Sequence, residues 1–147
     1  MNQKGLTIIE LIVVMVIIAI GATLMVPGIG RWLPTYRLKG ATRDVISTMR
    51  VAQIKAVSTN TWYRVSFNPG SNNYILQHQG SGGLWVDEGE VQAMPSGVRI
   101  NNTTFTGNIA TFYPDSRATN GSVTLTNTKG FQKVIQLLGA TGRIRHG

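Results

Sequence analysis

The stretch that decides the fold is residues 4–26. It begins with KGLTIIE (residues 4–10) and continues as an uncharged run, LIVVMVIIAIGATLMV (residues 11–26). About 20 apolar residues are enough for a helix to cross the hydrocarbon core of a bilayer. Glu10 interrupts the apolar pattern, and one ionised side chain at membrane depth costs roughly 2.5–3.5 kcal/mol on insertion scales. A carboxylate persists there where a countercharge pairs with it, so Glu10 is a candidate functional residue.

Three kinds of N-terminal segment are consistent with a basic leader and an apolar run. A secretory signal peptide has a shorter apolar core and a small-residue cleavage site of the A-x-A type, which this stretch lacks. A plain membrane anchor explains the length of the run but leaves Glu10 unexplained. The third interpretation rests on a resemblance of residues 5–10 to a known motif, and it accounts for Glu10 as well as for the length of the run.

The motif Gly5-Leu6-Thr7-Ile8-Ile9-Glu10 resembles the cleavage and assembly motif of type IV prepilins and type II secretion pseudopilins. The resemblance implies a leader of residues 1–5, which a membrane peptidase removes after Gly5, and methylation of the new N-terminus at Leu6. It also implies that Glu10 meets the freed amine of a neighbouring subunit in a filament. Leu6 stands where phenylalanine is commoner, which is a conservative difference.

Composition is consistent with one membrane-tethered, exported domain. We expect residues 6–26 to form the transmembrane and assembly helix, so most of the 147 residues remain for a single small domain. There are no cysteines, which excludes disulfides, thiolate metal sites and a cysteine nucleophile. The net charge is +8, and Lys4 and Glu10 are the only charged residues among the first thirty. The positive excess therefore lies outside the predicted membrane segment, where it favours nucleic acid, anionic lipid or acidic polymers as partners.

Residues 27–59 are expected to continue the helix. Pro27 and Pro34, with glycines between them, predict a kink or a melted segment, because proline removes a helical hydrogen bond and glycine weakens the helix. From residue 36 to residue 57 the apolar residues recur at three- and four-residue steps, which predicts one buried face. That face consists of Leu38, Ala41, Val45, Met49, Ala52 and Ala56.

Basic side chains flank the predicted buried face. Lys39, Arg43 and Arg50 lie about a third of a turn away from it. The simpler interpretation is a solvated surface. The alternative is a juxtamembrane patch on anionic lipid headgroups, where each nearby charge contributes about 1 kcal/mol.

Residues 60–147 change to a strand pattern. Alternating apolar residues separated by turn residues, such as those at 68–73, predict a hairpin followed by further short strands. The implied fold class is α+β, with a long N-terminal helix packed on an antiparallel, β-rich C-terminal domain. The expected strands cover residues 62–67, 74–79, 84–86, 91–94, 98–100, 109–113, 123–125 and 131–138.

The C-terminal half carries a second resemblance. The segments Phe112-Tyr113-Pro114 and Gly121-Ser122-Val123-Thr124-Leu125, and the ending Leu138-Gly139-Ala140-Thr141-Gly142-Arg143-Ile144-Arg145, are similar to the domain shared by H-type pseudopilins of type II secretion and FimT-type minor pilins. This resemblance implies a pilin-like fold over residues 60–147. With the leader motif, it covers most of the chain.

Catalysis and metal binding have little support in the sequence. His78 and His146 lie on a predicted strand and at the C-terminal end, without the carboxylate and serine of a catalytic triad, and we interpret both as solvated. Asp87, Glu88 and Glu90 offer oxygen ligands for Ca²⁺ but lack the EF-hand spacing, so a solvated loop is the better interpretation. We expect no cofactor.

The ending Gly142-Arg143-Ile144-Arg145 opens an alternative function. FimT-like minor pilins of competent bacteria are thought to bind DNA through a terminal Gly-Arg-x-Arg element, which these residues match. Strand alternation predicts that Arg143 and Arg145 point to one side, where guanidinium groups suit phosphate oxygens without sequence preference. Lys129 and Lys133 add positive charge nearby. A similar ending also occurs in secretion pseudopilins, so DNA binding stays an alternative.

The resemblance implies a structural subunit rather than an enzyme. It would be a minor pilin or pseudopilin that assembles at or near the tip of a type IV pilus or a type II secretion pseudopilus, or alternatively a DNA-binding minor pilin for uptake. Its implied partners are other pilins or pseudopilins, the prepilin peptidase and the inner-membrane assembly platform. Its implied location is the bacterial inner membrane, with a single pass and a periplasmic C-terminal domain, and it would be extracellular once incorporated into a pilus.

Overall fold

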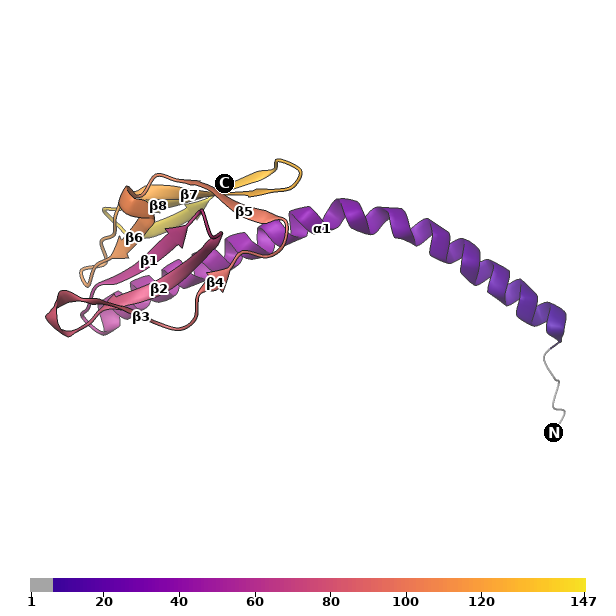
Figure 1. Ribbon diagram of the computed structural model, residues 1–147, viewed down its shortest axis with the longest axis horizontal. Coiled ribbons are helices and arrows are strands. Elements are labelled where there is room, and N and C mark those ends of the chain that lie inside the picture. Colours follow the sequence, from indigo (N-terminus) through magenta and orange to yellow (C-terminus); the bar gives the residue numbers. More distant parts are fainter. Residues whose placement is uncertain (1–6) are drawn as a thin grey trace, which may run out of the picture. The chain divides into compact units, whose positions relative to one another are not determined.

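The structure, a computed structural model, describes the backbone of residues 7–147 and the side chains of residues 7–23 and 32–147. The chain divides into an N-terminal unit, Met1–Leu33, and a C-terminal unit, Pro34–Gly147. One helix, α1 (Ile8–Ser58), belongs to both units (Figure 1).

In the N-terminal unit, α1 exposes its apolar side chains on all sides. The large apolar side chains from Ile8 to Ile20 are each about half exposed or more. A helix that is apolar all round needs lipid or other helices to cover it. Within the part of the chain whose side chains are described, no helix combines the length and hydropathy that a membrane crossing requires. Residues 6 and 24–26 of the predicted membrane segment lie outside those described side chains.

The predicted melting between Pro27 and Pro34 is wrong. The backbone of α1 is helical without interruption through both prolines. Each proline removes one N–H donor and costs roughly 3 kcal/mol in a helix interior. The helical hydrogen bonds of the surrounding turns nevertheless continue across the segment.

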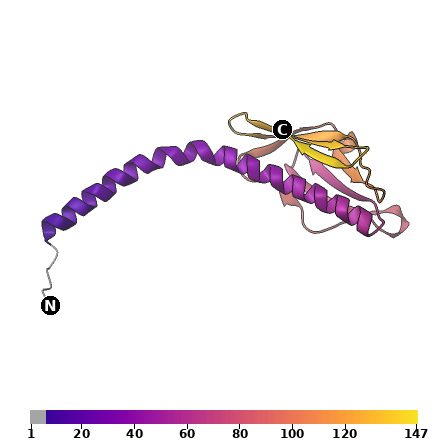
Figure 2. The same ribbon diagram turned by 180° about the vertical axis from the view of Figure 1, so that it is seen from behind.

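The C-terminal unit contains two antiparallel sheets beside the last part of α1 (Figures 1 and 2). The first sheet has the order β3-β2-β1-β6, with β4 also paired to β2. Its strands are β1 (Tyr63–Asn68), β2 (Asn73–Gln79), β3 (Trp85–Asp87), β4 (Gln92–Ala93) and β6 (Ile109–Phe112). The second sheet has the order β5-β7-β8-β9, with β5 (Val98–Thr103), β7 (Gly121–Asn127), β8 (Gln132–Leu138) and β9 (Arg143–His146). Two short 3-10 helices, η1 (Ser81–Gly83) and η2 (Thr106–Asn108), complete the unit.

The predicted buried face of α1 is confirmed. All six predicted positions, Leu38 to Ala56, are at most 2% exposed, and they share one hydrophobic core with both sheets. The inward side chains alternate along the strands, as in β1, where every second residue from Tyr63 is buried. The α+β architecture predicted from periodicity is therefore the observed one.

The side chain of Asn72 makes hydrogen bonds that connect the first sheet to the second. Its side-chain amide donates to the carbonyl of Val98 at 2.8 Å, and its side-chain oxygen accepts the N–H of Ile100 at 2.9 Å. Its own carbonyl accepts the N–H of Met94 at 3.0 Å. Asn72 has a positive φ of 55°, a conformation that asparagine tolerates better than most residues. This one side chain thus satisfies backbone groups of β5 from the turn before β2.

Candidate functional site

Glu10 lies in the first turn of α1, and its backbone is fixed by Thr7. The N–H of Glu10 donates to Oγ1 of Thr7 at 3.3 Å and to the carbonyl of Thr7 at 3.1 Å. Thr7-Ile8-Ile9-Glu10 has the spacing of a capping box, in which the first residue caps the helix and the fourth is Glu or Gln. A carboxylate here also interacts favourably with the positive end of the helix dipole. The predicted assembly residue therefore stands at a capped helix start, which sequence spacing alone could have shown.

The predicted processing residues, Gly5 and Leu6, lie outside the described residues. Their assignment as the cleavage and methylation sites stays a prediction. The first described residue, Thr7, is the one that caps α1.

The Gly-Arg-x-Arg ending forms a turn and the edge strand β9. Arg143 and Arg145 are exposed, and Ile144 packs against the core, so the predicted alternation is confirmed. Gly142 is buried with a φ of +60°, and a Cβ there would lie 2.6 Å from the carbonyl oxygen of Ser116. The fold therefore requires glycine at position 142, whether or not a ligand binds nearby.

The structure separates the two predicted lysines from the two arginines. Lys129 is exposed in the turn between β7 and β8. Lys133 shares the inward side of β8 with the buried Ile135 and Leu137. Arg143 and Arg145 pair with Leu138 and Gln136, which lie on the outward side. The apolar alternation of β8 was the available sequence signal that Lys133 faces the helix side of the sheet.

Lys133 instead lies beside the basic residues Lys39 and Arg43 of α1. A cavity of about 290 Å³ is lined by Lys133 and His146 from the second sheet and by Lys39, Thr42, Arg43 and Ile46 from α1. No carboxylate is among these described lining residues. The helix flank and the C-terminal strands are far apart in the sequence, and the fold brings them together.

A second missed cluster lies on the opposite flank of α1. Lys55 forms an ion pair with Oε1 of Glu88, and Nδ1 of His78 lies 3.3 Å from Oε2 of the same carboxylate. Burial alone would raise the pKa of Glu88, but the hydrogen bond from Lys55 and the charge of Lys55 lower it. The hydrogen bond to Glu88 raises the pKa of Lys55. The prediction that His78 and Glu88 are simply solvated is therefore wrong, because each is partly buried against the other.

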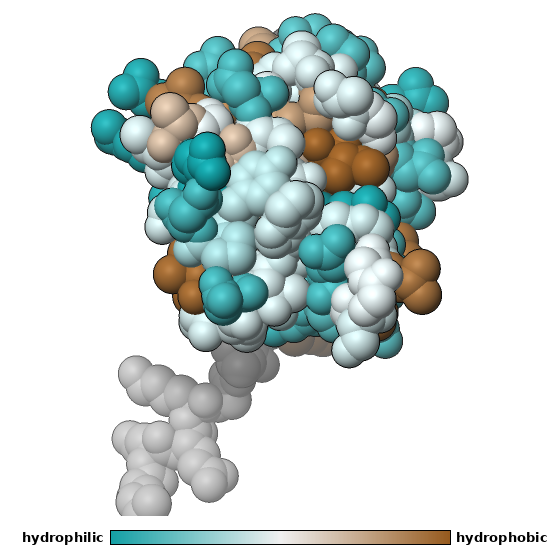
Figure 3. Space-filling view, turned by 90° about the vertical axis from the view of Figure 1, so that its left-hand side faces the viewer, coloured by the Kyte–Doolittle hydropathy of each residue, from teal (hydrophilic) through white to brown (hydrophobic). Residues whose placement is uncertain are grey.

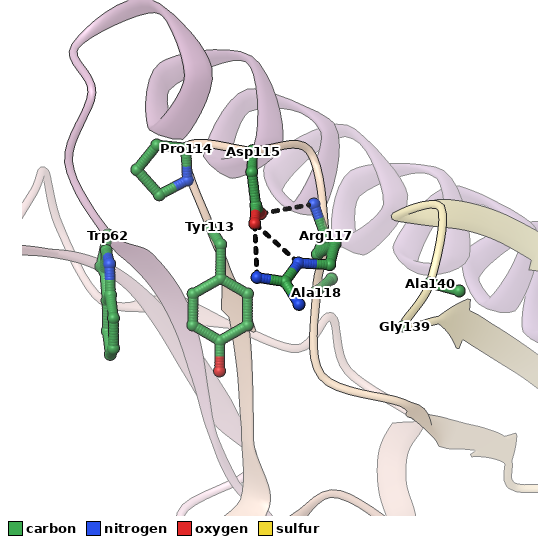
Figure 4. A pocket seen from close by; sticks show the side chains of 8 residues that line it. All are labelled: Trp62, Tyr113, Pro114, Asp115, Arg117, Ala118, Gly139 and Ala140. Carbon is green, nitrogen blue, oxygen red and sulfur yellow. Dashed lines mark hydrogen bonds and ion pairs between the residues drawn. The ribbon is translucent and has the colours of Figure 1, made fainter.

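A larger cavity, of about 800 Å³, lies where loops meet near the end of α1 (Figure 4). Trp62 and Tyr113 pack edge to face on one side, with ring centroids 5.0 Å apart. Asp115 accepts hydrogen bonds from the guanidinium and the N–H of Arg117, which lowers the pKa of that carboxyl. The charges of Asp115 and Arg117 neutralise each other. The most prominent feature of the lining is therefore the aromatic pair Trp62 and Tyr113. The remaining lining residues are Pro114, Ala118, Gly139 and Ala140.

The end of the C-terminal unit where α1 terminates is mostly polar. Figure 3 shows this face as hydrophilic to neutral, with separate hydrophobic patches. Among the residues that the structure describes, no group of three His, Cys, Asp or Glu side chains is placed to hold a metal ion.

Comparison with known families matches both halves of the chain. Residues 1–26 match the prokaryotic N-terminal methylation motif, and residues 41–141 match the family of type II transport protein GspH. The second match covers more than half of the 147 residues. A search of curated proteins found no significant match.

Solved structures share the fold at low sequence identity. A structure of the minor pseudopilin EpsH from the type II secretion system of Vibrio cholerae aligns with a TM-score of 0.66 and 7% identity, covering 76% of this chain and 96% of that one. A second EpsH crystal structure gives 0.65 and 7%, covering 78% and 97%. The solution structure of E. coli GspH gives 0.62 and 12%, covering 76% and 88%.

These findings confirm the predicted pilin-like fold and the H-type pseudopilin resemblance, and they give no support to DNA uptake. The methylation motif implies processing by a prepilin peptidase, and the family implies an inner-membrane-anchored precursor that assembles with pseudopilins. The family is structural rather than enzymatic, as the sequence predicted. The chain belongs to the GspH family, the minor pseudopilins of type II secretion, and carries the N-terminal methylation motif.

Proposed function

We propose that the chain is cleaved after Gly5, methylated at Leu6 and incorporated at or near the tip of a type II secretion pseudopilus. In this proposal the precursor crosses the inner membrane once through residues 6–26, and residues 60–147 lie in the periplasm. The inner-membrane assembly platform and other pseudopilins are its partners. Incorporation into a type IV pilus, with exposure outside the cell, is less favoured because the matched family belongs to secretion.

The observation that carries the proposal is the position of Glu10 within the methylation motif. Thr7 and Glu10 form the start of α1, directly after the predicted cut. Cleavage would leave a new amine within a few residues of this carboxylate. Between two subunits whose apolar helix surfaces exclude water, such an amine and carboxylate attract strongly, and an unpaired Glu10 would be costly.

Mass spectrometry of the membrane-extracted protein tests the processing step. We expect a mature species that begins at methylated Leu6. Gly5→Val should accumulate uncleaved precursor, because a side chain at the cut obstructs close approach of the backbone. Gly21→Ala is the matched control, since a Cβ at Gly21 has no atom within 4 Å. A mature species that begins at any other residue would refute the processing proposal.

A further inference from the structure

The basic cavity between α1 and the second sheet combines residues from three elements. Lys39 and Arg43 are one helical turn apart, so both side chains lie on the same flank of α1. Lys133 continues the inward row of β8, and His146 of β9 is paired with Ile135 in that same row. Helix and strand periodicity together therefore direct these four side chains toward one cavity of about 290 Å³.

Three cations elsewhere in the C-terminal unit have described partners, whereas those of this cavity do not. On the opposite flank of α1, Lys55 pairs with Glu88 and Arg37 donates to the carbonyl of Ser96. Arg117 likewise pairs with Asp115. Among the described residues, Lys39, Arg43 and Lys133 take part in no ion pair or side-chain hydrogen bond, so their mutual repulsion is relieved by no carboxylate of the fold.

One of the residues that line the cavity, Ile46, is apolar. Ile46 is only 7% exposed and contributes its side chain to the lining. Thr42 is also buried, and its hydroxyl donates to the carbonyl of Leu38 at 2.7 Å, so its proton is not available to a ligand. A ligand with a short apolar stem and an anionic end is complementary to this arrangement, because the stem covers Ile46 while the charge meets the three cations.

We propose that this cavity binds glutamate side chains from an acidic segment of a partner protein. Glutamate has the methylene stem and the carboxylate that the lining requires, and guanidinium groups hold carboxylates bidentately. A second copy of this chain is disfavoured as the partner, because two subunits of net charge +8 repel each other. Nucleic acid fits less well, because no Phe, Tyr or Trp is among the described residues that line the cavity to stack a base.

This inference goes beyond the proposed pseudopilus assembly, because it assigns a partner chemistry to a surface that assembly does not specify. Peptide binding is measured on the isolated chain, whereas assembly is measured in cells. Failure of one is therefore distinguishable from failure of the other.

The test uses the full chain in a neutral detergent at near-physiological salt, titrated with a fluorescent hexaglutamate peptide. We expect saturable binding, with hexaglutamine showing none. Arg43→Gln with Lys133→Gln should weaken binding about tenfold or more. Arg143→Gln with Arg145→Gln removes the same charge from the outward side of the second sheet, and it should leave the affinity within about twofold of the unmodified chain, as expected for distant exposed charges.

Three results would overturn the proposal. Equal losses from the two pairs would mean that the peptide senses overall charge only, and absence of binding would mean that the cavity is not a site. Lys39→Gln with Arg43→Gln repeats the comparison at two exposed helix positions, so a folding defect of the Lys133 variant cannot decide the result. Displacement of the peptide by duplex DNA that depends on Arg43 and Lys133 would assign the cavity to nucleic acid instead.

Discussion

Lys55, in the last turn of α1, forms an ion pair with Glu88, which follows β3 and lies 33 positions along the chain. The carboxylate joins the helix to the edge of the first sheet, and its second oxygen faces Nδ1 of His78 at 3.3 Å. Both of these facing atoms are buried without another hydrogen-bond partner in the described structure, and a proton on Nδ1 would satisfy them together.

The stability of the C-terminal unit should fall with acid through Glu88. The folded pKa of Glu88 lies below the ordinary value of 4.5, so its contribution is fully present above pH 4.5 and is lost as the pH falls through the lowered folded value. Glu88→Gln should therefore lower the melting temperature by a few degrees at pH 7 and make little difference in strong acid. Thermal unfolding across this pH range measures the effect. Glu90→Gln in the same exposed loop is the control, and a pH-independent difference for Glu88→Gln would contradict the ion-pair role.

Glu10→Gln should reduce pseudopilus incorporation without preventing membrane insertion or cleavage. Glutamine also serves as the fourth residue of a capping box, so the variant keeps the helix start and removes only the charge. The subunit content of sheared pseudopili measures incorporation.

Thr7→Ala is the matched control for Glu10→Gln. It removes the hydroxyl that caps α1, at a cost of about 1 kcal/mol, and keeps the carboxylate. Incorporation of the Thr7 variant should stay close to normal. If the Gln variant assembles as well as the unmodified chain, Glu10 does not act through its charge.

Met49→Ala should destabilise the C-terminal unit by about 2–5 kcal/mol, because the truncated side chain leaves a cavity in a packed core. Met49 is 0% exposed on the buried face of α1, whereas Ile54 on the same helix is 67% exposed. Ile54→Ala should therefore stay within about 0.5 kcal/mol. Denaturant unfolding followed by tryptophan fluorescence distinguishes the two, and similar losses would mean that the assigned core face is incorrect.

Local periodicity was sufficient to predict the long helix and the places of most strands, but not the two 3-10 helices or the strand bounds. The buried face from Leu38 to Ala56 follows the helical period, and the strands follow the alternation and the turn residues, because both depend on neighbours in the sequence. The disruptive effect of Pro27 and Pro34 on the helix was overestimated for the same reason, because the predicted melting does not occur. Their local cost is real, but the surrounding helical hydrogen bonds maintain α1 through them.

Contacts between residues that are distant in the sequence could not be predicted from local patterns. Nothing local indicates that Lys133 meets Arg43, because the pairing of β8 with its neighbours and the packing on α1 place them together. The same holds for Lys55 and Glu88. The sequence did indicate which side of β8 each residue occupies. Lys133 lies two residues before the apolar Ile135 and so shares its inward side, whereas Arg143 and Arg145 lie on the outward side of the sheet.

The outward side of the second sheet is a basic surface that duplex DNA can test. Arg143 and Arg145 are exposed there, and the described strands of that sheet contain no Asp or Glu. We expect the full chain in neutral detergent to show weak, salt-sensitive attraction to duplexes of unrelated sequence, because phosphate neutralisation releases counterions. Replacing Arg143 and Arg145 with glutamine should cost no more than replacing Lys39 and Arg43, since each pair removes the same charge. Gel-shift titrations at near-physiological salt compare them. A far larger loss from the Arg143 and Arg145 pair would instead indicate a dedicated DNA-binding strand.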